Sequence, residues 1–161
     1  MKLSNHYQNA YVTHDIEKAI SMLEIKYGFE GISPGEIELD VVTPSGNRKL
    51  HMQLAFCWID SMQFELIQPI SGCVEHYLSS LPSDETDFSL RFNHVAMRRD
   101  DMDAMRNEIK ELDLPVLFEG NLNGLCFIYV DARKSLGHIL EYVCTTPEIW
   151  NLLGWPAGKQ I

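Results

Sequence analysis

Four side chains that can bind a metal ion occupy matching places in the two halves of this sequence. Glu65 and Glu141 each lie inside an apolar, strand-like run. A carboxylate in such a run is costly to bury unless it has a partner. Gln8 and His94 lie in two earlier strand-like runs, one in each half. Two acidic side chains at equivalent positions suggest one shared cation as their partner.

The elements that would position these residues follow the same order twice. Hydrophobic periodicity and strand composition in the first half predict a strand, a helix and three strands, at residues 7–12, 15–28, 36–44, 51–58 and 62–68. The second half repeats this order, with predicted elements at 92–98, 100–112, 115–118, 125–130 and 138–143. We therefore expect a first βαβββ module at residues 1–70, a linker at 71–90, and a second module plus a C-terminal tail at 91–161.

The repeat also holds residue by residue. The segment 94–103 aligns with 8–17 without a gap, so that Ala96 matches Ala10 and Asp101 matches Asp15. Internal repetition of a supersecondary unit is a strong signal of architecture. Alternate residues of a strand share a face, so Gln8 should lie beside Ala10 and His94 beside Ala96. A small residue beside each polar one leaves room above the sheet.

Composition narrows the class of protein. The net charge of −10 disfavours nucleic acid, which needs clustered Lys and Arg. None of the four cysteines falls in a CxxC pair, so a thiolate zinc site is not expected. The N-terminus has no apolar signal core and no segment approaches membrane-span length, so we expect a cytoplasmic protein with no membrane contact. The remaining histidines are expected outside the site, at positions 6, 14, 51, 76 and 138.

Three motifs resemble the vicinal oxygen chelate superfamily, which includes glyoxalases, bleomycin-resistance proteins and dioxygenases. Residues 92–104, FNHVAMRRDDMDA, resemble the start of a second module in glyoxalase I and methylmalonyl-CoA epimerase. Residues 64–69, FELIQP, and 137–142, GHILEY, resemble the strands that close the first and second modules. The resemblance covers most of the chain. It implies an α+β fold in which the two modules form a cupped mixed β-sheet with the helices outside.

The resemblance also implies a metal site and a reaction. In this family one divalent ion is held by a residue from each of four strands, which here are Gln8, Glu65, His94 and Glu141. Zn²⁺, Ni²⁺, Co²⁺ and Mn²⁺ suit that donor set. The expected enzyme is a metal-dependent isomerase or lyase that transfers a proton next to a carbonyl of a small-molecule substrate. Glu141, or Glu65, would be the catalytic base.

Two other functions are compatible with the same fold: a non-haem iron dioxygenase, and a bleomycin-resistance-like protein that binds a small molecule without turnover. The dioxygenases use two His and one Glu, a pattern from which Gln8 departs. By analogy we expect a homodimer, with Trp150 and Trp155 as candidate interface residues. Candidate pocket residues are Phe56, Trp58, Phe118 and Phe127, and candidate anion-binding residues are Arg98, Arg99, Arg133 and Lys134.

Overall fold

A computed structural model describes residues 1–156, which form eight strands and five helices. In chain order these are β1 (His6–Val12), α1 (Ile16–Tyr27), β2 (Gly35–Thr43), β3 (Gly46–Ile59), β4 (Met62–Gly72), α2 (Glu75–Leu78), β5 (Arg91–Arg99), α3 (Met102–Leu112), β6 (Val116–Leu122), β7 (Leu125–Val130), α4 (Arg133–Leu136), β8 (Ile139–Cys144) and α5 (Pro147–Leu152). The predicted second module ran to residue 161, and its last residues, 157–161, lie outside the described part of the chain.

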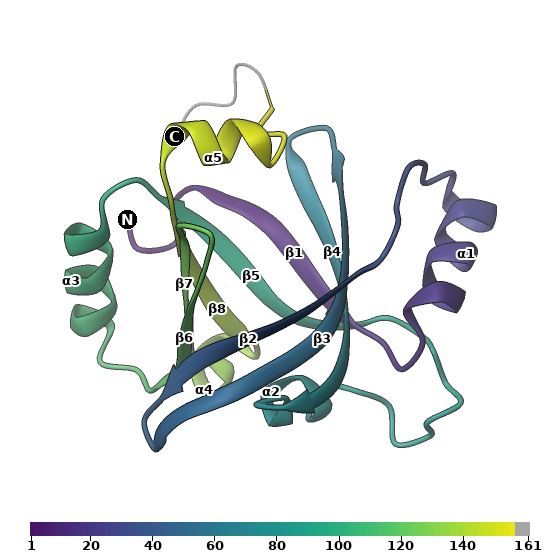
Figure 1. The fold of residues 1–161 in the computed structure, drawn as a ribbon, viewed down its shortest axis with the longest axis horizontal. Helices are drawn as coiled ribbons and strands as arrows, with labels where there is room; N and C mark the ends of the chain where they lie inside the picture. The colour runs from purple at the N-terminus through teal and green to yellow at the C-terminus, as the bar shows by residue number, and fades with distance from the viewer. Residues whose placement is uncertain (157–161) are drawn as a thin grey trace.

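All eight strands belong to one curved mixed sheet, so the expected α+β fold is confirmed (Figure 1). The strands follow the order β1-β4-β3-β2-β6-β7-β8-β5 and the sheet closes into a barrel. The pairs β1–β4 and β5–β8 are parallel, and the other neighbours are antiparallel. The two halves meet twice, at the long β1–β5 pairing and at two residue pairs between β2 and β6. The pairing of β2 with β6 therefore closes the expected cupped sheet into a barrel.

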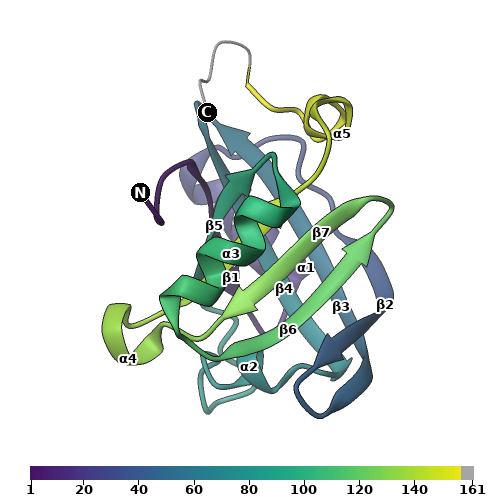
Figure 2. The ribbon, with the colours of Figure 1, turned by 90° about the vertical axis from the view of Figure 1, so that its left-hand side faces the viewer.

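The two longer helices lie outside the barrel, on opposite sides of it (Figures 1 and 2). Asp15 and Asp101, which match each other in the repeat, cap them, each accepting a hydrogen bond from a backbone N–H in the first turn. The apolar stripe of α1, which includes Ile16 and Ile20, packs on the outer face of the first-half strands. Met105 and Ile109 of α3 pack on the second-half strands in the same way. The helices thus cover the outer faces and leave the barrel interior to other side chains.

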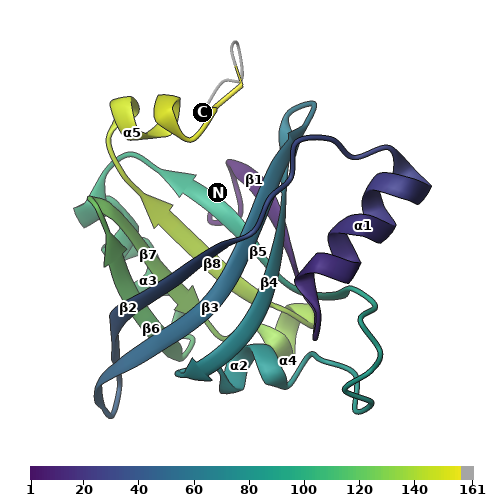
Figure 3. The same cartoon turned by 45° about the vertical axis from the view of Figure 1, so that its right-hand side comes forward.

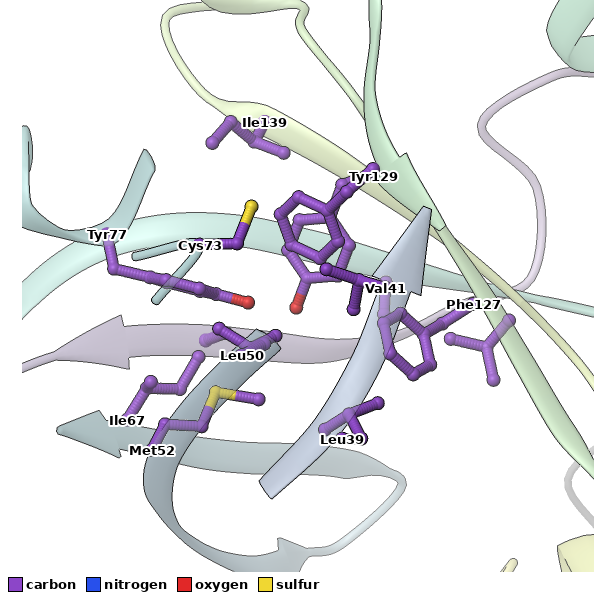
Figure 4. Close-up of a cluster of buried hydrophobic side chains, with 14 of the residues drawn as sticks. Leu39, Val41, Leu50, Met52, Ile67, Cys73, Tyr77, Phe127, Tyr129 and Ile139 are labelled. Atoms are coloured by element: carbon purple, nitrogen blue, oxygen red, sulfur yellow. The ribbon is translucent and has the colours of Figure 1, made fainter. Parts of the chain in front are cut away.

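The barrel interior is apolar toward one end and is closed there by α2 (Figures 3 and 4). Tyr77 of α2 is completely buried and lies against the rings of Phe118 and Tyr129. The opposite end is covered by α5, which follows the last strand (Figure 1). None of the helices in residues 1–156 is long and apolar enough to cross a membrane.

The hairpin of β2 and β3 is longer than its sequence predicts. Residues 46–50 lie outside the predicted strand, yet β3 already begins at Gly46. The ladder continues because Lys49 sits opposite Asp40, with Nζ 3.1 Å from Oδ1, and the exposed charges face solvent across the two strands. The run of turn-forming and charged residues at 46–49 hid this part of the strand.

The tail packs on its own barrel. Trp150 is only 1% exposed and contacts Tyr7 edge to face, with ring centroids 5.2 Å apart. Trp58 Nε1 also donates to the carbonyl of Leu153, at 2.9 Å. Trp150 is therefore not available for a subunit interface, and that part of the expectation is wrong. The homodimer itself stays a prediction.

A pair of substitutions in α5 tests this docking. Trp150→Ala should lower the free energy of unfolding by about 3–5 kcal/mol, because it removes a fully buried ring. Leu152→Ala, in the same helix but 85% exposed, should change it by less than about 0.5 kcal/mol. Urea denaturation followed by circular dichroism gives both values. Equal losses for the two variants would contradict the docking of α5 on its own barrel.

Candidate metal centre and cavity

The four predicted site residues lie on four neighbouring strands, in the order β4, β1, β5 and β8. Strand register places them in two rows across the sheet. In one row Ala10 stands between Glu65 and His94. In the other row Ala96 stands between Gln8 and Glu141. The two alanines leave space above the sheet, and the longer polar side chains on either side reach into it.

His94 joins the two carboxylates. Its Nε2 lies 3.3 Å from Glu141 Oε2 and 3.5 Å from Glu65 Oε2. The imidazole is completely buried, and both carboxylates are about one-tenth exposed. Glu65 Oε2 makes no hydrogen bond of good geometry, so its contact with His94 is mainly ionic. Two acidic groups therefore share a single buried ring.

The electrostatics follow from this sharing. Burial opposes a charge on His94 and lowers its pKa, but the contacts with Glu141 and Glu65 outweigh that effect and raise the pKa to about 9. Burial also raises the pKa of Glu65, and the nearby His94 offsets this only in part. Without a metal ion, protonation of the His94 imidazole supplies the positive charge beside these carboxylates.

The other ring nitrogen of His94, Nδ1, is hydrogen-bonded to the neighbouring Asn93. Nδ1 lies 3.0 Å from Asn93 Oδ1, which fixes Nδ1 as the donor because an amide oxygen only accepts. Asn93 is itself fixed, since its Nδ2 donates to the His76 carbonyl and to Ser80 Oγ. Histidine ligands of metals commonly donate their second N–H to such a partner. Nε2 is thus directed at the carboxylates.

Gln8 presents its oxygen to the same space. Its Nε2 donates to Gln63 Oε1 at 2.7 Å, which leaves Gln8 Oε1 buried without a hydrogen-bond partner. Tyr129 contributes its hydroxyl 3.3 Å from His94 Nε2. Buried polar atoms without partners are rare and point to a missing water, ion or ligand. Gln8 Oε1 and Glu65 Oε2 are two such atoms at one site.

The donor chemistry fits a divalent cation, although the donors do not yet surround one point. Among residues 1–156, no three His, Cys, Asp or Glu side chains have the arrangement of a metal centre. In an octahedron with bonds of about 2.1 Å, adjacent donors lie about 3 Å apart. The separations of 3.3 and 3.5 Å between His94 and the carboxylates are close to that value. Each carboxylate oxygen thus lies about as far from His94 Nε2 as an adjacent donor would, which is compatible with one shared ion.

A cavity of about 160 Å³ opens beside these residues. Gln8, Glu65 and Glu141 lie in its wall, and apolar side chains form most of the rest. Those apolar residues are Ile37, Met52, Leu54, Phe56, Leu122, Leu125, Phe127, Val143, Trp150 and Leu153. Gly120 shapes one wall, because a Cβ there would come within 2.2 Å of the Phe127 ring. The candidate metal centre is therefore the polar patch of an apolar chamber.

Several predicted lining and anion-binding residues lie elsewhere. Phe56 and Phe127 line the cavity, as expected, whereas Phe118 is buried in the core below it. Trp58 belongs to an aromatic cluster with Tyr7 and Trp155. The arginines are paired with carboxylates: Arg98 with Asp100, Arg99 with Glu108 and Arg133 with Asp131. Short local ion pairs, formed by loop and helix contacts, account for these charges.

Sequence reasoning missed four residues of the site. Gln63 could have been found, since it precedes Glu65 by two positions and must share its face. Asn93 adjoins His94, but only its contacts with α2 and the loop after it show its role. Tyr129 and Trp150 reach the site through strand pairing and helix docking. No local pattern predicts contacts across such separations.

A titration of the metal-free protein checks the charge on His94. We expect the imidazole to titrate near pH 9 by NMR, well above the ordinary value of about 6.5. Because the folded-state pKa is the higher one, the stabilisation is complete below about pH 6.5 and is lost as pH rises toward 9. Glu141→Gln should lower the pKa of His94 toward its ordinary value. An unchanged pKa in that variant would contradict the pairing.

Comparison with known proteins gives a fold. No family model matches the sequence, and no curated protein matches it. Among solved structures, a variant of Streptomyces coelicolor methylmalonyl-CoA epimerase in complex with 2-nitronate-propionyl-CoA superposes with a TM-score of 0.57 at 17% identity, over 90% of this chain and 96% of that one. Mycobacterium tuberculosis methylmalonyl-CoA epimerase gives a TM-score of 0.57 at 14% identity, over 92% of each chain. A methylmalonyl-CoA epimerase in complex with methylmalonyl-CoA and NH4+ gives 0.56 at 17% identity, over 89% and 95%.

These likenesses extend over nearly the whole chain on both sides. The curved eight-stranded sheet is therefore shared with those enzymes, whereas identities of 14–17% say nothing of the side chains of the site. The chain has a glyoxalase-like fold.

Proposed function

We propose that this protein is a metal-dependent isomerase or lyase that transfers a proton next to the carbonyl of a small molecule. The observation that carries the proposal is the pair of buried carboxylates on either side of His94, in the wall of an apolar cavity. Burying two acids beside one imidazole is costly, and a site that gained only stability would be better built from apolar residues. Strongly perturbed titratable groups in a cavity are typical of functional sites.

The proposed ligands are Gln8 through Oε1, His94 through Nε2, and the carboxylates of Glu65 and Glu141. Oxygen and imidazole donors of this kind suit Zn²⁺, Ni²⁺, Co²⁺ or Mn²⁺. When bound, such an ion supplies a Lewis acid that polarises a carbonyl and stabilises negative charge on its oxygen. Gln63 orients the amide of Gln8 for this role, and Asn93 orients the ring of His94.

Glu141 is the proposed base, with Glu65 as the second candidate. Both line the cavity, so either can reach a proton on a molecule bound there. A base works best when its pKa approaches the working pH, and burial moves the pKa of Glu65 in that direction. The apolar wall keeps water away from the carbanion-like species that loss of the proton creates. The proton returns from the same carboxylate to complete an isomerisation.

The residues of β3 bear on the choice of mechanism. Met52, Leu54 and Phe56 face the cavity from this strand, while Gln53 alternates with them and points away. An acid on β3 as a second base is thus absent from the cavity wall formed by residues 1–156. Glu141 and Glu65, singly or in turn, must then both remove and return the proton, or the reaction must stop at elimination. The structural neighbours bear the name of an isomerase, which favours the first course.

Metal binding is the first test. Titration of metal-free protein with Zn²⁺, Mn²⁺, Co²⁺ or Ni²⁺ should show one site per chain by calorimetry. At about 100 times its dissociation constant the ion should add about 2.7 kcal/mol of stability, seen as a higher Tm. His94→Ala should weaken binding, and Glu24→Gln, on the exposed face of α1, should not. Absence of any metal binding by the wild type would favour a non-catalytic binding protein.

Proton transfer is the second test. In D₂O the metal-loaded protein should exchange the hydrogen beside the carbonyl of probes such as hydroxyacetone, 2-hydroxyacetophenone or propionyl-CoA, followed by NMR. Glu141→Gln should slow exchange by about 10²–10⁴-fold, the usual contribution of a general base. Glu24→Gln serves as the matched control. If Glu141→Gln exchanges as fast as wild type while Glu65→Gln is inactive, Glu65 is the base; full activity in both sinks the mechanism.

A further inference from the structure

The charges around the cavity are all of one sign. Glu65 and Glu141 line it, and no Lys or Arg does so within the described residues. Arg98 is buried on β5, the strand that carries His94. Its guanidinium lies over the rings of Trp150 and Trp155, 4.8 and 4.2 Å from their centroids, and its Nε donates to Asp100. A divalent ion at the four ligands would just balance the two carboxylates. No charge would remain to receive an anionic group.

The shape and lining of the cavity indicate what it can hold. Its volume of about 160 Å³ is close to that of an engineered apolar cavity of about 150 Å³ that binds benzene. The wall opposite the site is formed by β2 and β6, which lie across the barrel from β1 and β5, and it presents Ile37 and Leu122. A benzene-sized apolar group fits the apolar part of such a space.

A third buried polar group among the wall residues has no partner, in addition to Gln8 Oε1 and Glu65 Oε2. Trp150 lines the cavity and is 1% exposed, yet its Nε1 makes no hydrogen bond within the described structure. An unpaired buried N–H costs free energy that a ligand oxygen can recover. Trp150 does not belong to the proposed metal centre. Its free donor is thus a second, independent sign that a ligand with an acceptor oxygen occupies this chamber.

We propose that the substrate is an uncharged, apolar carbonyl compound with a group of about benzene size, and that Trp150 Nε1 donates a hydrogen bond to one of its oxygens. This rests on the proposed function for the presence of the carbonyl. It separates this site from a binder of dicarboxylates: a second carboxylate in the chamber would be buried without a cation and close to Glu65 and Glu141. Two of the structural neighbours named above are in complex with CoA esters, and the acyl part of one of these, methylmalonyl-CoA, is such an acid.

The test compares three probes on metal-free protein in EDTA, by saturation-transfer NMR titration. Acetophenone carries the apolar ring and one acceptor oxygen, 4-acetylbenzoate adds a carboxylate, and ethylbenzene lacks the oxygen. We expect saturable binding of acetophenone to the wild type. 4-Acetylbenzoate should bind about tenfold more weakly or worse, since its charge is buried unpaired. Equal or tighter binding of 4-acetylbenzoate, or no saturable binding of acetophenone, would overturn the proposal.

Two variants locate the effect. Leu122→Lys places a cation in the wall at a position already 39% exposed, so the fold should tolerate it, and it should reverse the preference in favour of 4-acetylbenzoate. Leu152→Lys, in α5 and outside the cavity, is the matched control and should keep the wild-type preference. If Leu122→Lys and Leu152→Lys behave alike, the probes bind elsewhere and the proposal fails.

A third variant tests the indole donor. Trp150→Phe keeps an aromatic ring and removes the N–H, so it should weaken acetophenone several-fold and leave ethylbenzene unchanged. Equal effects on the two probes would assign Trp150 a packing role only. Because these titrations need no metal, they remain informative if metal binding or proton exchange fails. Conversely, a metal-loaded, active protein that prefers 4-acetylbenzoate would sink this proposal alone.

Discussion

The burial of two carboxylates beside one imidazole is the constraint on which the rest of the structure depends. Glu65 and Glu141 point into the space above Ala10 and Ala96, their neighbours on the adjacent strands, and are therefore buried inside the barrel. Such a cluster needs positive charge, from a proton on His94 or from a cation. The closed sheet and the helices at the two ends of the barrel, α2 and α5, exclude bulk water from this cluster. One side of the cluster faces the cavity.

Much of this arrangement could be predicted from the sequence because it is periodic. The gapless match of residues 94–103 to 8–17 predicts two strands of equal role, and period-two alternation then places Ala10 beside Gln8 and Ala96 beside His94. The helix caps at Asp15 and Asp101 follow from local hydrogen bonding. Each of these features depends on residues a few positions apart, which is the range over which a sequence carries physical information directly.

What could not be predicted depends on contacts between distant segments. Closure of the sheet requires β2 to pair with β6, and nothing in the sequence around Val41 or Gly120 predicts that pairing. The same holds for Tyr129, which reaches His94 from another strand, and for Trp150, whose indole arrives from the tail. The sequence predicts anion binding equally well for three arginines, Arg98, Arg99 and Arg133. Only the structure shows that each is already paired with a nearby carboxylate. Side-chain partners, rather than secondary structure, are the information that the fold adds.

The way the barrel is closed has a consequence for how a ligand could enter. Long ladders join most neighbouring strands, but β2 and β6 are joined through only two residue pairs, and these strands lie across the barrel from β1 and β5. This short seam is the cheapest place to part the wall, because few hydrogen bonds cross it. Parting it would widen the chamber on the apolar side and leave the pairing of Gln8 and His94 with their neighbours intact on the other. A ligand that entered there would pass along the wall opposite the candidate metal centre and would not disturb it.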